Sequence, residues 1–331
     1  MNFIPSYKNI DIEEFNRKGR LADTILQSCK SCPRNCKIDR TNGELGICAS
    51  GSLPIVSSYT PHFGEEPVLS GTKGAGNIFF GNCNLNCVYC QNFIISQKPK
   101  IEKKNEVTIE RLADIMLELQ EKGCHNIGLV SPTHYSASII KSIKIAVERG
   151  LNLPIIYNTN GYDSVEVLSL YDGIINIYLP DFKYGDNTEG KIYSKVDDYF
   201  DRTKEAITEM YRQVGSELIY ENGNVVKGLI IRHLILPNGL ADTEKVFKFI
   251  SELDPKIHVS LMAQYYPANI ANRYMLINRS VSNTEYSRAI ELLDKFGLEN
   301  GWIQELESSE SYRPYFDKNR TDPFNNDRLK R

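Results

Sequence analysis

The sequence predicts an α/β fold, in the form of a curved and partly open barrel of six strand–helix units. Between Asn77 and Met262, six short apolar segments alternate with segments of helical periodicity. Such alternation is typical of a parallel sheet with right-handed crossovers, and six units are too few for a closed eight-stranded barrel. A cysteine-rich stretch precedes the first of these strands. We therefore expect a partial (β/α)6 barrel with a cysteine-rich N-terminal extension.

Apolar runs and turn residues locate the elements in order. We expect strands over 78–80, 127–130, 154–157, 175–179, 229–236 and 258–262. Helices are expected up to Leu26, after Thr108 as N-cap, and over 139–150, 165–170, 203–214, 244–253 and from Glu285 onward. We divide the chain into an N-terminal extension (1–70), a core (71–270) and a C-terminal extension (271–331). In parallel α/β sheets, functional residues follow the strands.

Composition excludes several classes of protein. The 331 residues are 41% hydrophobic and 24% charged, with a net charge of -3, so a broad basic surface for wrapping nucleic acid is not expected. No apolar run approaches the roughly 18–20 residues that span a bilayer. The N-terminus lacks the basic and apolar regions of a secretory signal. We therefore expect a cytoplasmic protein, in whose reducing compartment clustered cysteines indicate metal ligands or catalytic thiols.

Seven of the eight cysteines fall in two groups, and Cys124 alone is expected to be a buried apolar residue. Cys83, Cys87 and Cys90 follow the first expected strand with the spacing C-x3-C-x2-C. Three thiolates leave one iron of a four-iron cluster open, whereas structural zinc needs four ligands. The spacing favours an iron–sulfur cluster with an open iron. Zinc completed by a distant ligand is the alternative.

This loop resembles that of the radical S-adenosylmethionine (SAM) superfamily, including the aromatic Tyr89 before the last cysteine. The resemblance implies a 4Fe-4S cluster whose open iron binds the amino and carboxylate groups of SAM. It also implies reductive cleavage of SAM to methionine and a 5′-deoxyadenosyl radical, which abstracts a substrate hydrogen. Tyr89 is implied to pack near the adenine, and its alternative role is an apolar anchor of the loop. A one-electron reductant protein of flavodoxin or ferredoxin type is the implied partner.

Further motifs resemble those of the uncharacterised homologues of pyruvate formate-lyase activating enzyme. They are Cys29-x2-Cys-Pro-Arg-Asn-Cys36, Gly43-Glu-Leu-Gly-Ile-Cys48, His62-Phe-Gly-Glu-Glu-Pro67, Ser131-Pro-Thr-His134, Tyr157-Asn-Thr-Asn-Gly-Tyr162, Leu179-Pro-Asp-Phe-Lys183, Arg232-His-Leu-Ile-Leu-Pro237 and Met262-Ala-Gln-Tyr265. The match covers about residues 28–302. It implies an oxidoreductase, and activation of a glycyl radical enzyme, which would be a protein substrate, is one option.

Polar residues after the strands are candidates for SAM binding. Asn160 follows the third strand, and Asp181 and Lys183 follow the fourth, where the activases carry Asp-x-Lys. By the resemblance, the lysine would pair with the SAM carboxylate and an acidic or amide group with the ribose hydroxyls. A surface ion pair is the alternative. We assign no catalytic residue beyond the cluster.

Two other strand-end positions are less defined. Of Arg232 and His233, only one can face the barrel interior, because neighbouring strand residues point to opposite faces. In the segment Ser131–His134, which replaces a Gly-Gly-Glu-like turn, Thr133 or His134 could accept a hydrogen bond from the SAM amino group. His134 could equally touch substrate or cap the following helix.

Cys29, Cys32, Cys36 and Cys48 are four soft ligands in a segment too short to fold by burial alone. We expect a second metal site here, holding either zinc or an iron–sulfur cluster. Three functions remain: a radical SAM enzyme, a non-catalytic iron–sulfur electron-transfer protein and a metal-stabilised binding protein. Cleavage of SAM after reduction separates the first from the others.

Overall fold

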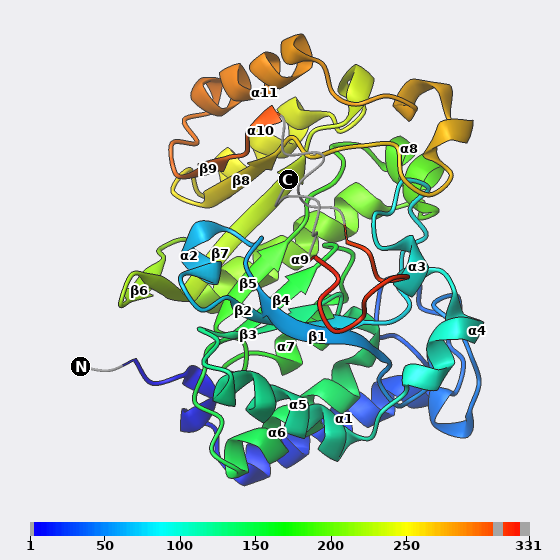
Figure 1. Cartoon of the computed structure of the whole chain (residues 1–331), viewed down its shortest axis with the longest axis vertical. Helices are drawn as coiled ribbons and strands as arrows, with labels where there is room; N and C mark the ends of the chain where they lie inside the picture. Colours follow the sequence, from blue (N-terminus) through cyan, green and yellow to red (C-terminus); the bar gives the residue numbers. More distant parts are fainter. Residues whose placement is uncertain (1–2, 307–313, 325–331) are drawn as a thin grey trace.

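The computed structural model describes residues 3–306 and 314–324. Its centre is a nine-stranded sheet with the order β1-β2-β3-β4-β5-β7-β8-β9, in which β6 pairs with β7 (Figure 1). The strands are β1 (Val56–His62), β2 (Ala75–Phe80), β3 (Ile127–Val130), β4 (Ile155–Thr159), β5 (Ile177–Pro180), β6 (Ile219–Glu221), β7 (Asn224–Leu234), β8 (His258–Met262) and β9 (Gly301–Ile303).

The sheet is parallel from β2 to β9, apart from the hairpin strand β6. β1 pairs with β2 in the antiparallel sense at one edge. Within the described residues the outer strands β1 and β9 do not pair with each other, so the sheet is open. The expected α/β fold with a partial, unclosed barrel is confirmed.

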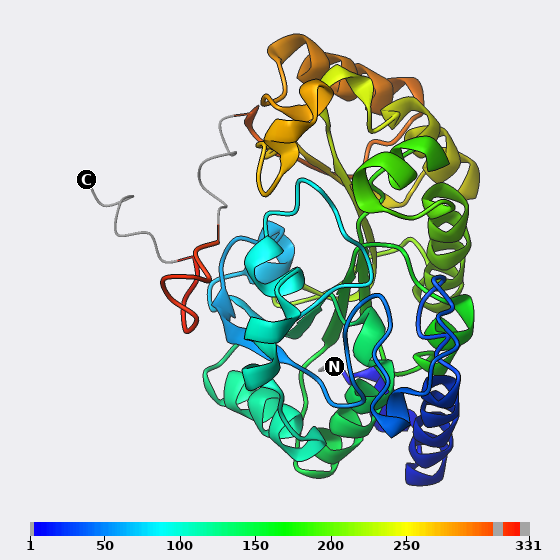
Figure 2. The same ribbon diagram turned by 90° about the vertical axis from the view of Figure 1, so that its right-hand side faces the viewer.

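Apart from α1 and α2, which precede β2, the helices lie in the connections between the parallel strands. The longer ones are α1 (Ile12–Gln27), α5 (Ile109–Glu121), α6 (Ser136–Glu148), α7 (Val165–Leu170), α9 (Tyr199–Val214), α10 (Thr243–Leu253) and α11 (Asn283–Lys295). Short ones are α2 (Pro67–Ser70), α3 (Phe93–Ser96), α4 (Pro99–Glu102) and α8 (Asn187–Glu189). Figure 2 shows helices along one side of the sheet and the chain of residues 83–105, in cyan, on the other.

Local sequence signals explain several helix starts. The Thr108 hydroxyl accepts the backbone N–H of Arg111 at 3.1 Å, as expected for the N-cap of α5. Asp11 caps α1 in the same way, and Ser282 forms a capping box with Glu285 before α11. These caps satisfy N–H groups that have no partner inside the helix.

The core lies between the sheet and its helices. Every residue of β2 is buried, and one face of α5 packs toward the sheet with the buried side chains Leu112, Ile115, Met116 and Leu119. Cys124, just beyond α5, is 3% exposed, which confirms its expected apolar role. Continuous apolar strands are the signature of a sheet buried on both faces.

Both terminal extensions supply an outer strand of the sheet. β1 belongs to residues 1–70 and pairs with β2, and β9 belongs to residues 271–331 and pairs with β8. The three-part division stays a prediction, but its parts share one sheet. Part of the C-terminal extension lies outside the described residues.

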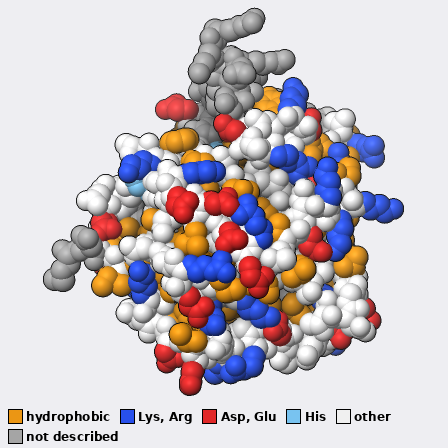
Figure 3. All heavy atoms as spheres, turned by 60° about the horizontal axis from the view of Figure 1, so that its bottom comes forward, with side chains coloured by type: hydrophobic (Ala, Val, Ile, Leu, Met, Phe, Trp, Pro, Cys, Tyr) orange, Lys and Arg blue, Asp and Glu red, His pale blue; other side chains and the backbone are white. Residues whose placement is uncertain are grey.

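Surface charge is mixed where the helices α1, α5 and α6 come to the surface. Figure 3 shows Lys and Arg side chains interspersed with Asp and Glu on this face. Ion pairs such as Arg149–Asp114 at 2.7 Å and Lys141–Asp23 at 2.5 Å account for some of this mixing. None of the helices in the described part of the chain is long and apolar enough to cross a membrane.

Candidate functional site

A cavity of about 490 Å³ lies at the carboxyl ends of the parallel strands. Strand-end residues of β3, β4, β5, β7 and β8 form part of its wall, together with the loop after β2. The polar and sulfur-bearing members of the lining include Glu65, Glu66, Cys83, Cys87, Cys90, Ser131, Asn160, Asp181, Lys183, Arg232, Ser260 and Gln264. This is the edge of the sheet at which the sequence predicts the functional residues.

The three cysteines of the loop after β2 all line this cavity. Burial raises the pKa of the Cys83 thiol to about 12 and that of the Cys90 thiol to about 11, and it also raises the pKa of Cys87. Repulsion from Cys87 adds to the shift at both Cys83 and Cys90, because the three sulfurs are close together. Such thiols carry charge only when a cation compensates it.

Each of the three sulfurs has a side-chain partner. The Asn160 amide donates to Cys83 Sγ at 3.4 Å, Ser194 Oγ lies 3.0 Å from Cys87 Sγ, and Ser96 Oγ lies 3.3 Å from Cys90 Sγ. Asn160 follows β4, Ser194 ends the π-helical turn η5 (Gly190–Ser194) and Ser96 ends α3. Hydrogen bonds of this kind orient and tune sulfur ligands.

Backbone contacts hold the loop in place. Asn82 starts it in the left-handed region, with φ 66°, and its N–H donates to the carbonyl of Ile95 at 2.8 Å. The N–H of Val88 donates to the carbonyl of Tyr193 at 2.8 Å, and the Val88 carbonyl accepts from Ile270 at 3.1 Å. The loop is therefore fixed by segments far apart in the sequence, which presents all three thiols to one cavity.

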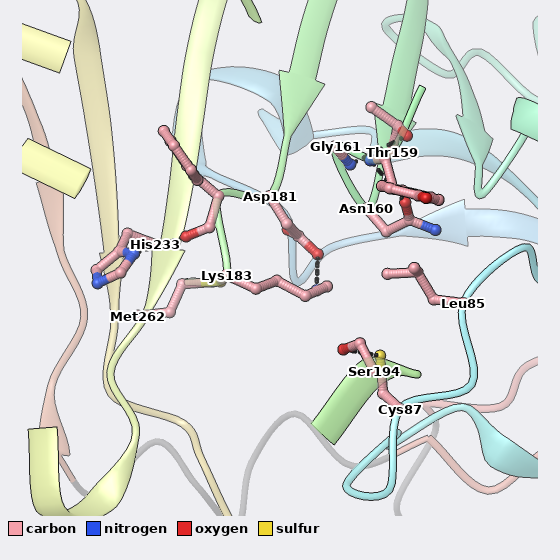
Figure 4. Close-up of polar contacts among 12 residues, drawn as sticks. Leu85, Cys87, Thr159, Asn160, Gly161, Asp181, Lys183, Ser194, His233 and Met262 are labelled. Atoms are coloured by element: carbon pink, nitrogen blue, oxygen red, sulfur yellow. Dashed lines mark hydrogen bonds and ion pairs between the residues drawn. The ribbon is translucent and has the colours of Figure 1, made fainter. Parts of the chain in front are cut away.

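Asp181 and Lys183 meet at the end of β5. Lys183 Nζ lies 2.5 Å from Asp181 Oδ2, and Figure 4 shows the lysine side chain extending toward the loop of Leu85 and Cys87. Burial opposes the lysine charge, but Asp181 outweighs it, so the pKa of Lys183 is raised and the amine stays protonated. The pair faces the cavity and is mostly buried, which separates it from an ordinary surface ion pair.

Asn160 and its neighbours connect β4 to the cysteine loop. The Asn160 amide also donates to the Asn84 side-chain oxygen at 2.7 Å, and Asn84 donates to the Tyr162 carbonyl at 2.7 Å. The structure thus brings three of the four candidate cofactor residues, Asn160, Asp181 and Lys183, to the same cavity as the three cysteines.

Tyr89, the fourth candidate, also lines the cavity and is 5% exposed. Its hydroxyl lies 2.6 Å from the hydroxyl of Tyr184, which in turn lies 2.8 Å from Ser194 Oγ. Its ring packs edge-on against Tyr265. Tyr89 therefore belongs to a packed aromatic group and to a hydrogen-bonded chain that ends at Cys87.

Two expectations about strand ends turn out differently. Thr133 does not line the cavity: its hydroxyl donates to Asp163 Oδ1 at 2.7 Å. His134 also points elsewhere, with Nε2 bound to the Gly81 carbonyl at 3.0 Å, and burial lowers its pKa to about 3. Ser131 takes the cavity position instead, with φ 58°. The left-handed turn at Ser131 directs the next residues away from the cavity.

The expectation that only one of Arg232 and His233 faces the barrel interior is confirmed. Arg232 lines the cavity, whereas His233 is fully buried between the Phe182 carbonyl at 2.7 Å and Thr243 Oγ1 at 2.9 Å. Burial lowers the pKa of His233 to about 4, so it is a neutral structural residue at physiological pH.

Sequence reasoning missed one ion-paired group that lines the cavity and one buried carboxyl group just beyond the end of β4. Arg232 makes a two-bond ion pair with Glu66, at 2.8 Å for each bond, and also contacts Glu65. Asp163 accepts hydrogen bonds from Thr133, Thr159 and Tyr157, although burial raises its pKa. Glu65, Glu66 and Arg232 belong to motifs that were visible in the sequence, but no local signal paired Arg232 with carboxylates 166 and 167 residues away, and Asp163 lies just outside the Tyr157–Tyr162 motif.

The four N-terminal cysteines line a separate and much smaller cavity of about 10 Å³. Cys29 and Cys32 are buried, and Cys36 and Cys48 are half-buried. Burial raises the pKa of Cys32 to about 12, and the other three cysteines of the group add to the shift. Gly46 lies so close to Cys36 Sγ that a Cβ at this position would be 3.1 Å from the sulfur. The four thiols are thus gathered by the fold.

The donor set of the large cavity fits a 4Fe-4S cluster. Three soft thiols, of which Cys87 is buried and the other two are half-buried, line the cavity, each with a hydrogen-bond partner, and the cavity leaves room beside them. No group of three or more His, Cys, Asp or Glu residues in the ranges 3–306 and 314–324 is placed to hold a single metal ion. A cluster differs in this respect, because several irons separate its thiolates.

Comparison with known proteins agrees with this donor set. The Radical SAM superfamily matches residues 77–217 of the chain. An uncharacterized protein of Methanocaldococcus jannaschii, MJ0674, is 33% identical over 289 residues, which cover 85% of this chain and 79% of that protein. A second one, MJ0808 from the same organism, is 29% identical over 154 residues, or 42% of this chain and 45% of its own length. Residues 77–217 are therefore a radical SAM domain, and the chain as a whole is a relative of MJ0674.

Distant likenesses to solved structures also exist. Methylornithine synthase is 15% identical with a TM-score of 0.44, covering 90% of this chain and 72% of its own. HydG, a maturase of the FeFe hydrogenase, is 12% identical with a TM-score of 0.46, covering 90% of this chain and 58% of its own. These scores are too low to carry an argument about substrate or mechanism.

Proposed function

We propose that this protein is an enzyme that holds a 4Fe-4S cluster at Cys83, Cys87 and Cys90, cleaves SAM reductively and abstracts a hydrogen atom from a substrate. The observation that carries the proposal is the meeting of three thiols, one buried and two half-buried, and the Asp181–Lys183 pair on one cavity of about 490 Å³. When bound, the cluster supplies the electron that converts SAM to methionine and a 5′-deoxyadenosyl radical.

The chain's own residues have binding and orienting roles in this proposal. Lys183 stays protonated beside Asp181, so it offers a fixed positive charge to the carboxylate of SAM. Asp181 is the acceptor suited to the ribose hydroxyls, and Asn160 reaches the cavity beside Cys83. Tyr89 presents an aromatic edge of the cavity to the adenine. Fixed groups in a buried site position a reactive species and exclude water.

The direct test is anaerobic incubation of the reconstituted protein with SAM and titanium(III) citrate. We expect 5′-deoxyadenosine and methionine, measured by liquid chromatography with mass spectrometry. The matched control is Cys124→Ala, which removes a buried thiol outside both cysteine groups. Absence of 5′-deoxyadenosine from a protein with a full complement of iron would favour a non-catalytic electron-transfer protein instead.

For the substrate, we propose that a glycyl radical enzyme is one candidate, supported by the activase-like Asp-x-Lys at Asp181 and Lys183. A flavodoxin or ferredoxin is the proposed reductant, and the cytoplasm is the proposed location. The test uses a substrate protein labelled with deuterium at glycine. Deuterium in 5′-deoxyadenosine supports the activase role, and cleavage of SAM without transfer from any glycine contradicts it.

The four N-terminal cysteines are a separate proposed metal site. Cys29, Cys32, Cys36 and Cys48 line a cavity of their own and do not line the large one. A metal there is therefore not needed to complete the SAM site.

A further inference from the structure

The small cavity of the four N-terminal cysteines contains an unusual excess of positive charge. Arg34 and Arg40 both line it, and Arg40 is only 1% exposed. Within the described residues, no carboxylate forms an ion pair with either arginine. Arg40 instead contacts Cys29 Sγ at 3.9 Å and the carbonyl of Gly51. A buried cation without an anionic partner is costly, so the cavity needs a compensating negative charge.

Each of the two arginines also has an unpartnered buried N–H group. Among the described residues, neither Nη2 of Arg34 nor Nε of Arg40 has a hydrogen-bond partner. Unsatisfied buried polar atoms are rare in native proteins and point to a missing ion or ligand. Because arginine N–H groups only donate, the missing group must supply acceptors.

A metal centre bound by four thiolates meets both requirements. Four thiolates with one zinc, or with an oxidised 4Fe-4S core, carry a net charge of about -2, which offsets two guanidinium groups. The inorganic sulfides of a cluster are additional acceptors for N–H groups, and zinc has none of these. No three of the thiols are placed to hold a single ion, whereas a cluster keeps its thiolates at separate corners. The donors and the spacing therefore favour iron and sulfide.

The small cavity is joined to the catalytic loop by two direct contacts. Arg34 Nε donates to the carbonyl of Asn84, the residue after Cys83, at 2.5 Å. His134, which lines the small cavity, is bound through Nε2 to the carbonyl of Gly81, two residues before Cys83, at 3.0 Å. Arg34 and His134 thus each line the small cavity and contact the backbone of the loop that carries Cys83. Cys36 and Cys48 are half-buried, so the far side of the cavity is near the surface.

We propose that Cys29, Cys32, Cys36 and Cys48 hold a second 4Fe-4S cluster, which passes electrons from the surface to the catalytic cluster. A reduced flavodoxin or ferredoxin gives up one electron and is oxidised. The N-terminal cluster takes up this electron and is then reoxidised as the cluster at Cys83, Cys87 and Cys90 is reduced. The relay rests on the proposed function, but the presence of the second cluster does not.

The presence of the cluster is tested in the variant Cys83→Ala/Cys87→Ala/Cys90→Ala, purified anaerobically. We expect about four irons and four sulfides per chain, with an electron paramagnetic resonance (EPR) signal after reduction. One zinc per chain, or a folded protein without metal, would overturn the proposal. If this variant does not fold by circular dichroism, iron in the wild type is compared with Cys36→Ala/Cys48→Ala, which keeps only two of the four thiols, and about eight irons falling to four is expected. An equal iron content in both proteins overturns the cluster.

The relay is tested by the ratio of two SAM cleavage rates, one driven by reduced flavodoxin and the other by titanium(III) citrate. In Cys36→Ala/Cys48→Ala we expect loss of the flavodoxin-driven rate relative to the titanium-driven rate, and Cys124→Ala is the control. An unchanged ratio refutes the relay and leaves the metal analysis standing. No cleavage by the wild type with either reductant refutes the proposed function instead, without bearing on the second cluster.

Discussion

The two groups of cysteines differ most in the space beside them. Cys83, Cys87 and Cys90 line a cavity of about 490 Å³, whereas Cys29, Cys32, Cys36 and Cys48 line one of about 10 Å³. Three thiols with room beside them suit a centre that binds a further molecule, and four thiols without room suit a closed centre. The number of thiols and the free volume beside them thus independently assign the ligand-binding centre to the first group and the closed centre to the second.

The surroundings of the two groups differ as well. The sulfurs of Cys83, Cys87 and Cys90, here called the open group, contact Asn160, Ser194 and Ser96. The cavity that these sulfurs line also carries the Asp181–Lys183 pair. The four N-terminal cysteines, here called the closed group, are bordered by Arg34 and Arg40. These arginines have no carboxylate partners in the described structure. The first environment offers groups of both signs to a zwitterionic ligand. The second offers only positive charge to an anionic centre.

The largest expected effect is the loss of SAM cleavage when a cysteine of the open group is replaced. Replacement of Cys87 by Ala removes one of only three thiolates of the open cluster, so production of 5′-deoxyadenosine should fall to background. Chromatography of the anaerobic reaction measures this, with Cys124→Ala as the matched control. Wild-type production by Cys87→Ala would remove the catalytic assignment from this group.

Replacement of Arg40 by Met tests whether the closed group holds an anionic metal centre or consists of four neutral thiols. The two alternatives predict different changes in the free energy of unfolding. Beside an anionic centre, loss of the buried guanidinium should lower the free energy of unfolding by about 3 kcal/mol. Beside four neutral thiols, removal of an unpaired cation would leave stability unchanged or raise it. Urea unfolding of the anaerobic protein gives the answer, with the exposed Arg20→Met as control.

Replacement of Lys183 by Ala should weaken SAM binding by roughly tenfold to a hundredfold, because one charged hydrogen bond contributes about 1.5–3 kcal/mol. Iron content should not change, since Lys183 Nζ contacts Asp181 and not a cysteine. Calorimetric titration with SAM, without reductant, measures the affinity. The exposed Lys191→Ala is the control. Equal affinity in wild type and Lys183→Ala would reassign Lys183 to the substrate.

The smallest expected effect concerns Ser194, whose hydroxyl lies 3.0 Å from Cys87 Sγ. A donor to a thiolate stabilises the more negative, reduced state. Ser194→Ala should therefore lower the reduction potential of the open cluster by roughly 20–45 mV, the equivalent of about 0.5–1 kcal/mol for one electron. A potentiometric titration followed by EPR measures the shift, with the exposed Ser169→Ala as control. A potential equal to that of the wild type would mean that Ser194 does not donate to Cys87.

Much of the fold follows from local sequence signals. Strands β3 and β8 and helix α7 have the bounds expected from apolar runs and turns, and the N-cap of α5 is Thr108 as expected. The outer strands were missed for physical reasons. β1 contains Ser, Thr and Pro where an apolar run was sought, and β9 is only three residues long. Outer strands need less burial on both faces, so their sequences carry a weaker signal.

The candidate site likewise contains residues that the sequence predicts and contacts that it does not predict. Asn160, Asp181 and Lys183 were found because the ends of parallel strands converge, which follows from topology alone. The contact of Ser194 with Cys87 and the pairing of Glu66 with Arg232 were not found. Each joins positions more than 100 residues apart, and one sequence contains no record of such contacts.

The measurement that tests the distinction between the open and the closed group most directly is EPR of the reduced wild-type protein, before and after addition of SAM. We expect two cluster signals, of which only the one lost in Cys83→Ala/Cys87→Ala/Cys90→Ala changes when SAM binds. A change in both signals, or in the signal that this variant retains, would contradict the assignment of SAM binding to the cluster at Cys83, Cys87 and Cys90 alone. So would a single signal that SAM leaves unaltered.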